Sequence, residues 1–125
     1  MPVVLDTTVI IDHLRGLPSA VSYFASLPRR PACSEITRVE VVRGLRSPER
    51  NQAHRLFALL DWVPLTADIA QAAGELGRQW RKSHAAIDTA DLVIAATAQA
   101  LGRDVATVNV RHFPMFAGVA PAYET

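Results

Sequence analysis

Four short apolar runs, separated by longer stretches with helical spacing, constrain the fold of this chain more than any other feature. PVVL is continuous, rich in valine and ended by polar residues, as a buried strand is. Strands separated by pairs of helices need crossover connections, which give a parallel sheet with helices on both faces. The sequence therefore predicts a three-layer α/β/α sandwich around a mainly parallel sheet of four to five strands. The expected strands cover 2–5, 30–34, 62–65 and 104–110, with a fifth edge strand at 118–123.

Capping residues and apolar spacing predict the helices between these strands. Ser34 can cap the third helix, Ser47 the fourth, and Thr66 or Asp68 the fifth, while Gly102 ends the sixth. The expected helices cover 7–16, 19–27, 35–45, 47–60, 66–84 and 88–102.

Length and composition indicate a single globular domain over residues 1–125. The one cysteine, Cys33, cannot form an intrachain disulfide, which favours a reducing, cytoplasmic setting and a small buried side chain rather than a nucleophile. No secretory signal is visible, and the apolar stretch LVIAATAQAL is too short to span a bilayer.

The net charge of +1 does not announce a nucleic-acid partner, but its distribution is uneven. Residues 29–55 carry seven arginines against three acids. This excess could hold phosphates or could simply be a solvated helix surface, and composition alone leaves both interpretations open. The candidate phosphate contacts are Arg38, Arg43 and Arg46.

Three acids lie beside apolar residues, where a charge is costly unless it is compensated. Each also has a structural explanation: Asp6 could cap the following helix, Glu40 could pair with Arg43, and Asp91 could form a capping arrangement with Asp88. Singly, these acids say little about function.

Together, the three acids indicate a metal site. Carboxylates that converge in one cleft repel each other, and a divalent cation removes that penalty. Hard oxygen ligands without accompanying cysteines or paired histidines favour Mg²⁺ or Mn²⁺ over Zn²⁺. Asp6 follows the first strand and Asn109 follows DVATV, so both would lie at one edge of the sheet if those strands are neighbours.

The segments LDTTVIIDHLRG, SEITRVEVVRG, DTADLVIAATAQALG and ATVNVRHF, in this order, resemble the PIN domain, and most closely the VapC-type toxins of bacterial toxin–antitoxin pairs. The resemblance covers nearly the whole chain. It implies a magnesium-dependent endoribonuclease, with Mn²⁺ as a substitute, which leaves a 5′-phosphate and a 3′-hydroxyl. It also implies an RNA substrate, a VapB-like antitoxin that blocks the site, and a homodimer.

The same resemblance places catalytic and metal-binding carboxylates on Asp6, Glu40 and Asp91. Thr8 matches a hydroxyl position near the site, and Asn109 matches a polar residue after the last strand of the motif. His112 stands where the family often has an acid, which leaves open whether the site binds one metal ion or two.

Two other functions remain as alternatives. The chain could be a catalytically weak binding module that acts with a DNA-binding antitoxin in repression of its own operon. A phosphatase with Asp6 as nucleophile fits less well, because that chemistry commonly wants a second aspartate where this chain has Thr8. A metal-free ribonuclease could use two histidines, but nothing in the spacing pairs them, and His13, His54 and His84 are expected at the surface.

Overall fold

The computed structural model describes residues 2–83 and 86–124 of the chain. At its centre lies a four-stranded sheet in the order β3-β2-β1-β4, and all three pairs of neighbours are parallel. Val4 aligns with Ala32 on one side and with Val105 on the other. The first and last strands of the chain are therefore neighbours. The strands are β1 (Val4–Leu5), β2 (Ala32–Ser34), β3 (Asp61–Val63) and β4 (Val105–Ala106).

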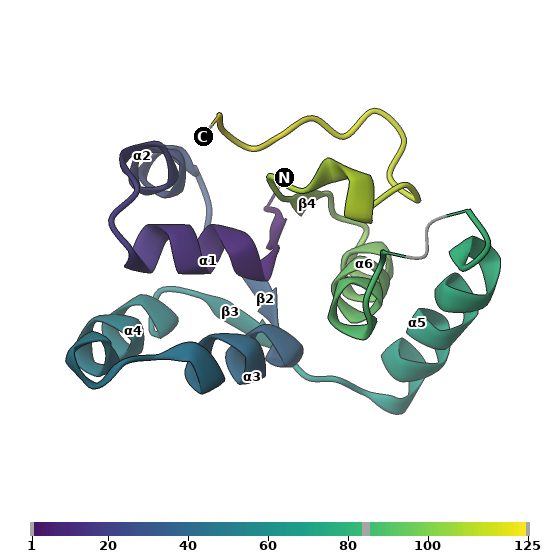
Figure 1. The fold of residues 1–125 in the computed structure, drawn as a ribbon, viewed down its shortest axis with the longest axis horizontal. Coiled ribbons are helices and arrows are strands. Elements are labelled where there is room, and N and C mark those ends of the chain that lie inside the picture. The colour runs from purple at the N-terminus through teal and green to yellow at the C-terminus, as the bar shows by residue number, and fades with distance from the viewer. Residues whose placement is uncertain (1, 84–85, 125) are drawn as a thin grey trace.

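Helices cover both faces of this sheet, as Figure 1 shows, with α1 to α4 on one side and α5 and α6 on the other. The described helices are α1 (Thr7–Leu14), α2 (Pro18–Ser26), α3 (Glu35–Gly44), α4 (Arg50–Phe57), α5 (Ala67–Trp80) and α6 (Thr89–Leu101), with 3₁₀ turns η1 (Ser47–Glu49) and η2 (Val110–His112). The predicted α/β/α sandwich with a parallel sheet is confirmed. Over the described residues, no helix combines the length and the apolar character that a bilayer crossing demands.

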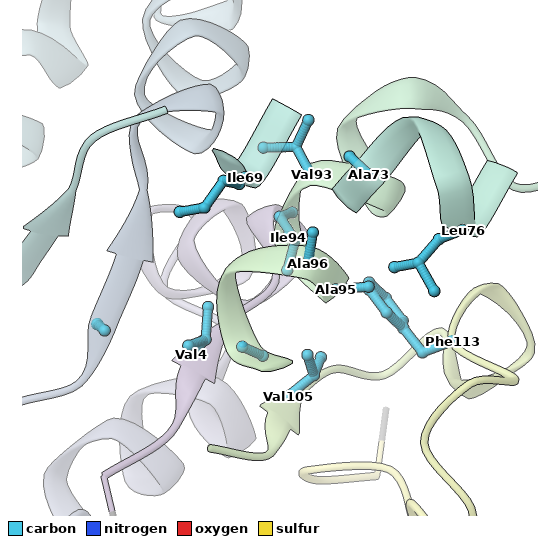
Figure 2. Close-up of a cluster of buried hydrophobic side chains, with 12 residues drawn as sticks. Val4, Ile69, Ala73, Leu76, Val93, Ile94, Ala95, Ala96, Val105 and Phe113 are labelled. Carbon is cyan, nitrogen blue, oxygen red and sulfur yellow. The ribbon is translucent and has the colours of Figure 1, made fainter. Parts of the chain in front are cut away.

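Two hydrophobic clusters hold the layers together, because successive residues of a strand point to opposite faces of a sheet. Val4, Ala32 and Val105 pack with side chains of α5 and α6 in the first cluster (Figure 2). The next residue of each strand packs in the second cluster, with side chains of α1, α3 and α4. Short strands that are buried on both faces explain why the apolar runs are continuous rather than alternating.

The expected fifth strand is wrong, since residues 118–123 contain no strand in the structure. Gly118 has a φ of +76°, which turns the chain, and Pro121 has no backbone N–H to offer a ladder. The Ala122 N–H still donates to the carbonyl oxygen of Thr107, just beyond β4, at 2.8 Å, and Ala122 packs against the second hydrophobic cluster.

The fourth strand is shorter than the predicted 104–110. The Thr107 hydroxyl accepts a hydrogen bond from the Asn109 N–H at 2.9 Å, and Asn109 then leads into η2. A side-chain acceptor that captures a backbone N–H two residues later is a common way to turn a chain out of a ladder.

Helix starts follow the predicted caps at Ser34, Thr66 and Asp88, whose side chains each accept a backbone N–H of the first turn. The predicted cap at Ser47 is wrong. The chain enters a 3₁₀ turn there, and Glu49 Oε1 accepts the Arg46 N–H at 2.9 Å, so Arg46 occupies the cap position. The fifth helix ends at Trp80 rather than at residue 84, which lies outside the described residues.

Candidate metal-dependent nuclease site

Asp6 lies at the carboxyl end of β1, directly after Leu5, and is only 3% exposed. Its Oδ2 accepts hydrogen bonds from the Thr8 hydroxyl at 2.9 Å and from the Thr107 hydroxyl at 2.8 Å. The side chain makes no capping bond to α1, although Asp6 occupies the cap position. The structural explanation of Asp6 as a helix cap is therefore wrong, and hydroxyl groups from two separate segments hold this carboxylate instead.

Asp91 lies in the first turn of α6 and is 7% exposed. Its Oδ2 accepts the Asp88 N–H at 3.2 Å, and the Asp88 side chain accepts the Asp91 N–H at 2.8 Å. The expected capping arrangement is thus present. The same Oδ2 lies 3.1 Å from Nδ1 of His112, which η2 carries to the start of α6.

Burial raises the pKa of Asp91 to about 7. The negative charges of Asp88 and Asp6 add to this rise, whereas the Asp88 N–H and the His112 ring oppose it. Asp6 and Asp91 are therefore close enough for one charge to affect the other, although they are 85 positions apart in the sequence. Two buried acids that strain each other are typical of a functional site.

Glu40 lies on α3 with its side chain 20% exposed. Its Oε1 accepts the Thr7 hydroxyl at 2.6 Å, and its Oε2 lies 4.0 Å from Nη2 of Arg43. The expected contact with Arg43 is thus long, while the bond to Thr7 is short. Because Thr7 directly follows Asp6, Glu40 is tied to the same end of β1 as Asp6.

The donor set suits a hard divalent cation, although the three acids do not form a ready three-ligand cage. Within residues 2–83 and 86–124, no group of three or more His, Cys, Asp or Glu side chains is placed to hold a metal ion. In the same residues, the hydrogen bonds and close contacts of Asp6 and Asp91 side chains all involve Oδ2, which leaves both Oδ1 atoms available. Mg²⁺ commonly uses one or two carboxylates plus waters and substrate phosphates, so this pair fits it.

Sequence reasoning misses two threonines, and the structure places Thr107 rather than the Asn109 side chain against Asp6. Asn109 is exposed and contributes its backbone N–H to Thr107, whereas the Thr107 hydroxyl contacts Asp6 itself. A signal for Thr107 is present in the sequence, because Thr107 follows β4 as Asp6 follows β1, and the two strands are neighbours in register. Thr7 is the second missed threonine: the resemblance indicates Thr8 alone, but the Thr7 hydroxyl donates to Glu40.

The three candidate phosphate-binding arginines each lie next to an acid three positions away. Arg38 pairs with Glu35, and its guanidinium also lies 4.0 Å from the centre of the Trp62 ring. Arg46 pairs with Glu49 at 3.2 Å. With Arg43 beside Glu40, the charge of this surface is partly balanced within α3 and η1.

Two further expectations can be compared with the structure. Cys33 is fully buried, and burial raises the pKa of its thiol to about 12, which confirms the small buried side chain. His13, expected at the surface, packs edge-on against Phe24, 5.0 Å between ring centres, and burial lowers its pKa. His54 is exposed as expected, and His84 lies outside the described residues.

Comparison with known proteins places the chain in a family. The family model described as PIN domain matches residues 3–118, so the chain belongs to the PIN domain family. It is 43% identical over 122 residues to a protein named Ribonuclease VapC19 from Mycobacterium tuberculosis, covering 95% of this chain and 98% of that protein.

More distant proteins agree with this assignment. A protein named Ribonuclease VapC1 from Methanocaldococcus jannaschii is 32% identical over 114 residues, which cover 89% of this chain and 78% of that protein. Among solved structures, a chain of a toxin–antitoxin complex from Klebsiella pneumoniae superposes with a TM-score of 0.82 at 27% identity, covering 98% of this chain and 99% of that chain.

Proposed function

We propose that this protein is a divalent-metal-dependent endoribonuclease that acts as the toxin of a toxin–antitoxin pair. The observation that carries the proposal is the pairing of Asp6 and Asp91, two buried acids at the end of β1 and in the first turn of α6, where the charge of Asp6 raises the pKa of Asp91. The relatives named ribonucleases support RNA as the substrate. The similar Klebsiella chain belongs to a toxin–antitoxin complex, which supports an antitoxin as the partner.

Asp6 and Asp91 are the proposed ligands of one Mg²⁺ or Mn²⁺ ion. The Thr8 and Thr107 hydroxyls hold Oδ2 of Asp6, and the Asp88 N–H and His112 contact Oδ2 of Asp91, so each residue can offer Oδ1. A bound ion of this kind lowers the pKa of a coordinated water and neutralises charge on a phosphate oxygen. With His112 in place of a further acid, the protein itself supplies enough carboxylates for one firmly held ion.

Glu40 is assigned to the attacking water rather than to direct coordination of the ion. Its Oε1 is held by Thr7, and no three-acid cluster forms in the part of the chain that the structure describes. A carboxylate held in this way can accept a proton from a water molecule and orient the lone pair of the water oxygen toward a phosphorus atom. Asp6 and Asp91 would then bind the metal ion, while Glu40 would orient the attacking water.

The cellular setting follows from the same proposal. The protein would act on cytoplasmic RNA, would be blocked by a VapB-like antitoxin and would form a homodimer. The single buried Cys33 is compatible with a reducing compartment.

The test is cleavage of a fluorescently labelled oligoribonucleotide in Mg²⁺ or Mn²⁺, with and without excess EDTA. EDTA and the substitution Asp6→Asn are each expected to reduce cleavage at least about a hundredfold, since both remove the metal-ion chemistry. Asp68→Asn is the matched control, because Asp68 is an exposed acid in the first turn of α5, as Asp91 is a buried one in the first turn of α6. Circular dichroism checks that each variant is folded.

Full activity in EDTA or in Asp6→Asn would contradict the proposal. Growth arrest on expression separates the enzyme from the binding module, because a module that only binds would arrest growth equally as wild type and as Asp6→Asn. Mapping of RNA 5′ ends after brief induction then identifies the target RNA.

A further inference from the structure

Two buried threonines form a chain of hydroxyls that ends on Glu40. Thr7, the first residue of α1, is 6% exposed, and Thr37 in α3 is fully buried. The Thr7 hydroxyl donates to Glu40 Oε1 at 2.6 Å, and the two threonine hydroxyls lie 3.0 Å apart. A hydroxyl can donate one hydrogen bond, and Thr7 donates its bond to the Glu40 carboxylate. The proton between the two threonines therefore comes from Thr37, and the chain runs from Thr37 through Thr7 to Glu40.

Another threonine in the same molecule shows that this arrangement is not the default. Thr97 is also buried in a helix, and its hydroxyl donates to the Val93 carbonyl oxygen one turn earlier, at 2.7 Å. That bond satisfies the hydroxyl within its own helix, and the described residues show no other partner for it. Thr37 instead donates to the Thr7 hydroxyl, and Thr7 donates to the carboxylate of Glu40, which links the start of α1 to α3.

The consequence is a fixed carboxylate next to Thr7, the residue that directly follows Asp6. A short O–H···O⁻ bond is among the strong hydrogen bonds of proteins, and it fixes Oε1 of Glu40. Among the described residues, Oε2 has only the long 4.0 Å contact with Arg43, whose side chain is 75% exposed. On its other side, Glu40 borders a cavity of about 50 Å³ that Ile11 and Leu14 of α1 also line, so water can reach this part of α3.

We propose that Thr7 and Thr37 are positioning residues that hold Glu40 so that its second oxygen orients the attacking water. This inference rests on the proposed function, in which Glu40 acts on water and Asp6 and Asp91 bind the ion. It separates two roles in the site: the hydroxyl chain serves the water, whereas Thr8 and Thr107 serve the metal-binding carboxylate of Asp6.

The test compares Thr7→Val, Thr7→Ser and Thr37→Val with Thr97→Val as the matched control. For each variant, kcat and KM are measured on an oligoribonucleotide in Mn²⁺, Mn²⁺ affinity by calorimetry, and folding by thermal unfolding. Thr7→Val is expected to lower kcat about 10- to 100-fold, as loss of a positioning partner does at metal sites. KM and Mn²⁺ affinity should stay within about twofold, because the metal-binding pair is untouched.

Three further results are expected. Thr7→Ser restores kcat, since it restores the hydroxyl. Thr97→Val leaves kcat unchanged, since its hydroxyl serves only the Val93 carbonyl. In a Glu40→Gln background, Thr7→Val causes no additional loss, because residues that act as a unit are not additive. If Thr7→Val does not fold, Thr37→Val answers the same question with a smaller loss of kcat.

The inference is overturned if folded Thr7→Val keeps full kcat, if it loses Mn²⁺ affinity in parallel with kcat, or if its effect multiplies with that of Glu40→Gln. Each of these outcomes leaves the proposed function standing, provided that the wild-type protein binds Mn²⁺ and cleaves RNA. A wild-type protein that does neither overturns the proposed function and this inference together.

Discussion

The carboxyl end of β1 and the arginine-rich surface of α3 and η1 differ in how their charges are arranged. Asp6 and Asp91 are buried acids of like sign, and the charge of one raises the pKa of the other. On the arginine surface, Arg38 and Arg46 each pair with an acid three residues away. Charges that are paired within one turn are explained by local structure. Charges that are buried together at a cost need another explanation, and a bound cation supplies one.

The largest expected effect concerns the stability cost of Asp91. Its pKa is raised from 3.8 to about 7, so the folded protein resists ionisation and loses stability as the pH rises from about 4 to 7. In Asp91→Asn, the side chain is neutral at every pH and this loss is absent. In EDTA, the free energy of unfolding of Asp91→Asn should therefore gain a few kcal/mol over wild type between pH 4 and pH 7.

Urea denaturation across this pH range measures that difference, with Asp68→Asn as the exposed control. Adding Mn²⁺ at pH 7 should stabilise the wild type and leave Asp91→Asn nearly unchanged, since a ligand stabilises only the state that binds it. If the difference in free energy of unfolding between Asp91→Asn and wild type does not change with pH, burial of Asp91 has no electrostatic cost. The acidic site would then not differ from the arginine surface in this respect.

A second, smaller effect concerns the hydroxyl that holds Asp6. Thr107→Val removes the 2.8 Å hydrogen bond to Oδ2 and keeps the shape of the side chain. Mn²⁺ affinity should fall about tenfold, because loss of a group that orients a metal ligand typically costs 10- to 100-fold. Thr107→Ser should restore it. Calorimetric titration measures both variants, and an unchanged affinity in Thr107→Val would show that Thr8 alone orients this carboxylate.

Asp91 and Thr107 also illustrate what can and what cannot be predicted from the sequence. Asp6 and Asp91 could be proposed from the sequence, because an acid directly after a buried strand or within an apolar helix start stands out among its apolar neighbours. Asp88 and Gly102 could be predicted because caps depend on local backbone geometry alone.

The resemblance indicates Thr8, but the other hydroxyl partners, Thr7 and Thr107, could not be chosen in the same way. Whether Thr7, Thr8 or Thr107 touches a given carboxylate depends on strand register and helix approach, which are set by the whole fold. The same is true of the short fourth strand, which ends where the Thr107 side chain captures a backbone N–H that a ladder would have used. The pairing of Arg38 with Trp62 likewise joins two residues that only β2–β3 pairing brings together.

Arg38 tests the other side of the comparison. Its guanidinium stacks on Trp62 and pairs with Glu35, so Arg38→Ala should lower the free energy of unfolding by about 1 kcal/mol through lost packing. Cleavage of RNA should change less than about twofold, since a structural arginine is not a phosphate contact. Arg38→Lys sharpens the test because it keeps the charge but loses the planar group. Thermal unfolding and cleavage rates measured on both variants separate packing from phosphate binding: rescue of cleavage by Lys would favour a phosphate contact.

Arg46 should give the smallest effect of the series. Its side chain is 79% exposed and pairs with Glu49, while the cap of η1 uses the Arg46 backbone N–H, which Arg46→Gln retains. The melting temperature should shift by less than about 1 °C, as for most exposed ion pairs. The slope of log Kd for RNA against log salt concentration should also stay unchanged, whereas loss of one phosphate contact to a single strand would reduce it by about 0.7. A reduced slope would mean that Arg46 exchanges Glu49 for a phosphate when RNA binds. The arginine surface and the acidic site would then form one RNA-binding region. The local ion pairs with glutamates would be present only in the RNA-free protein.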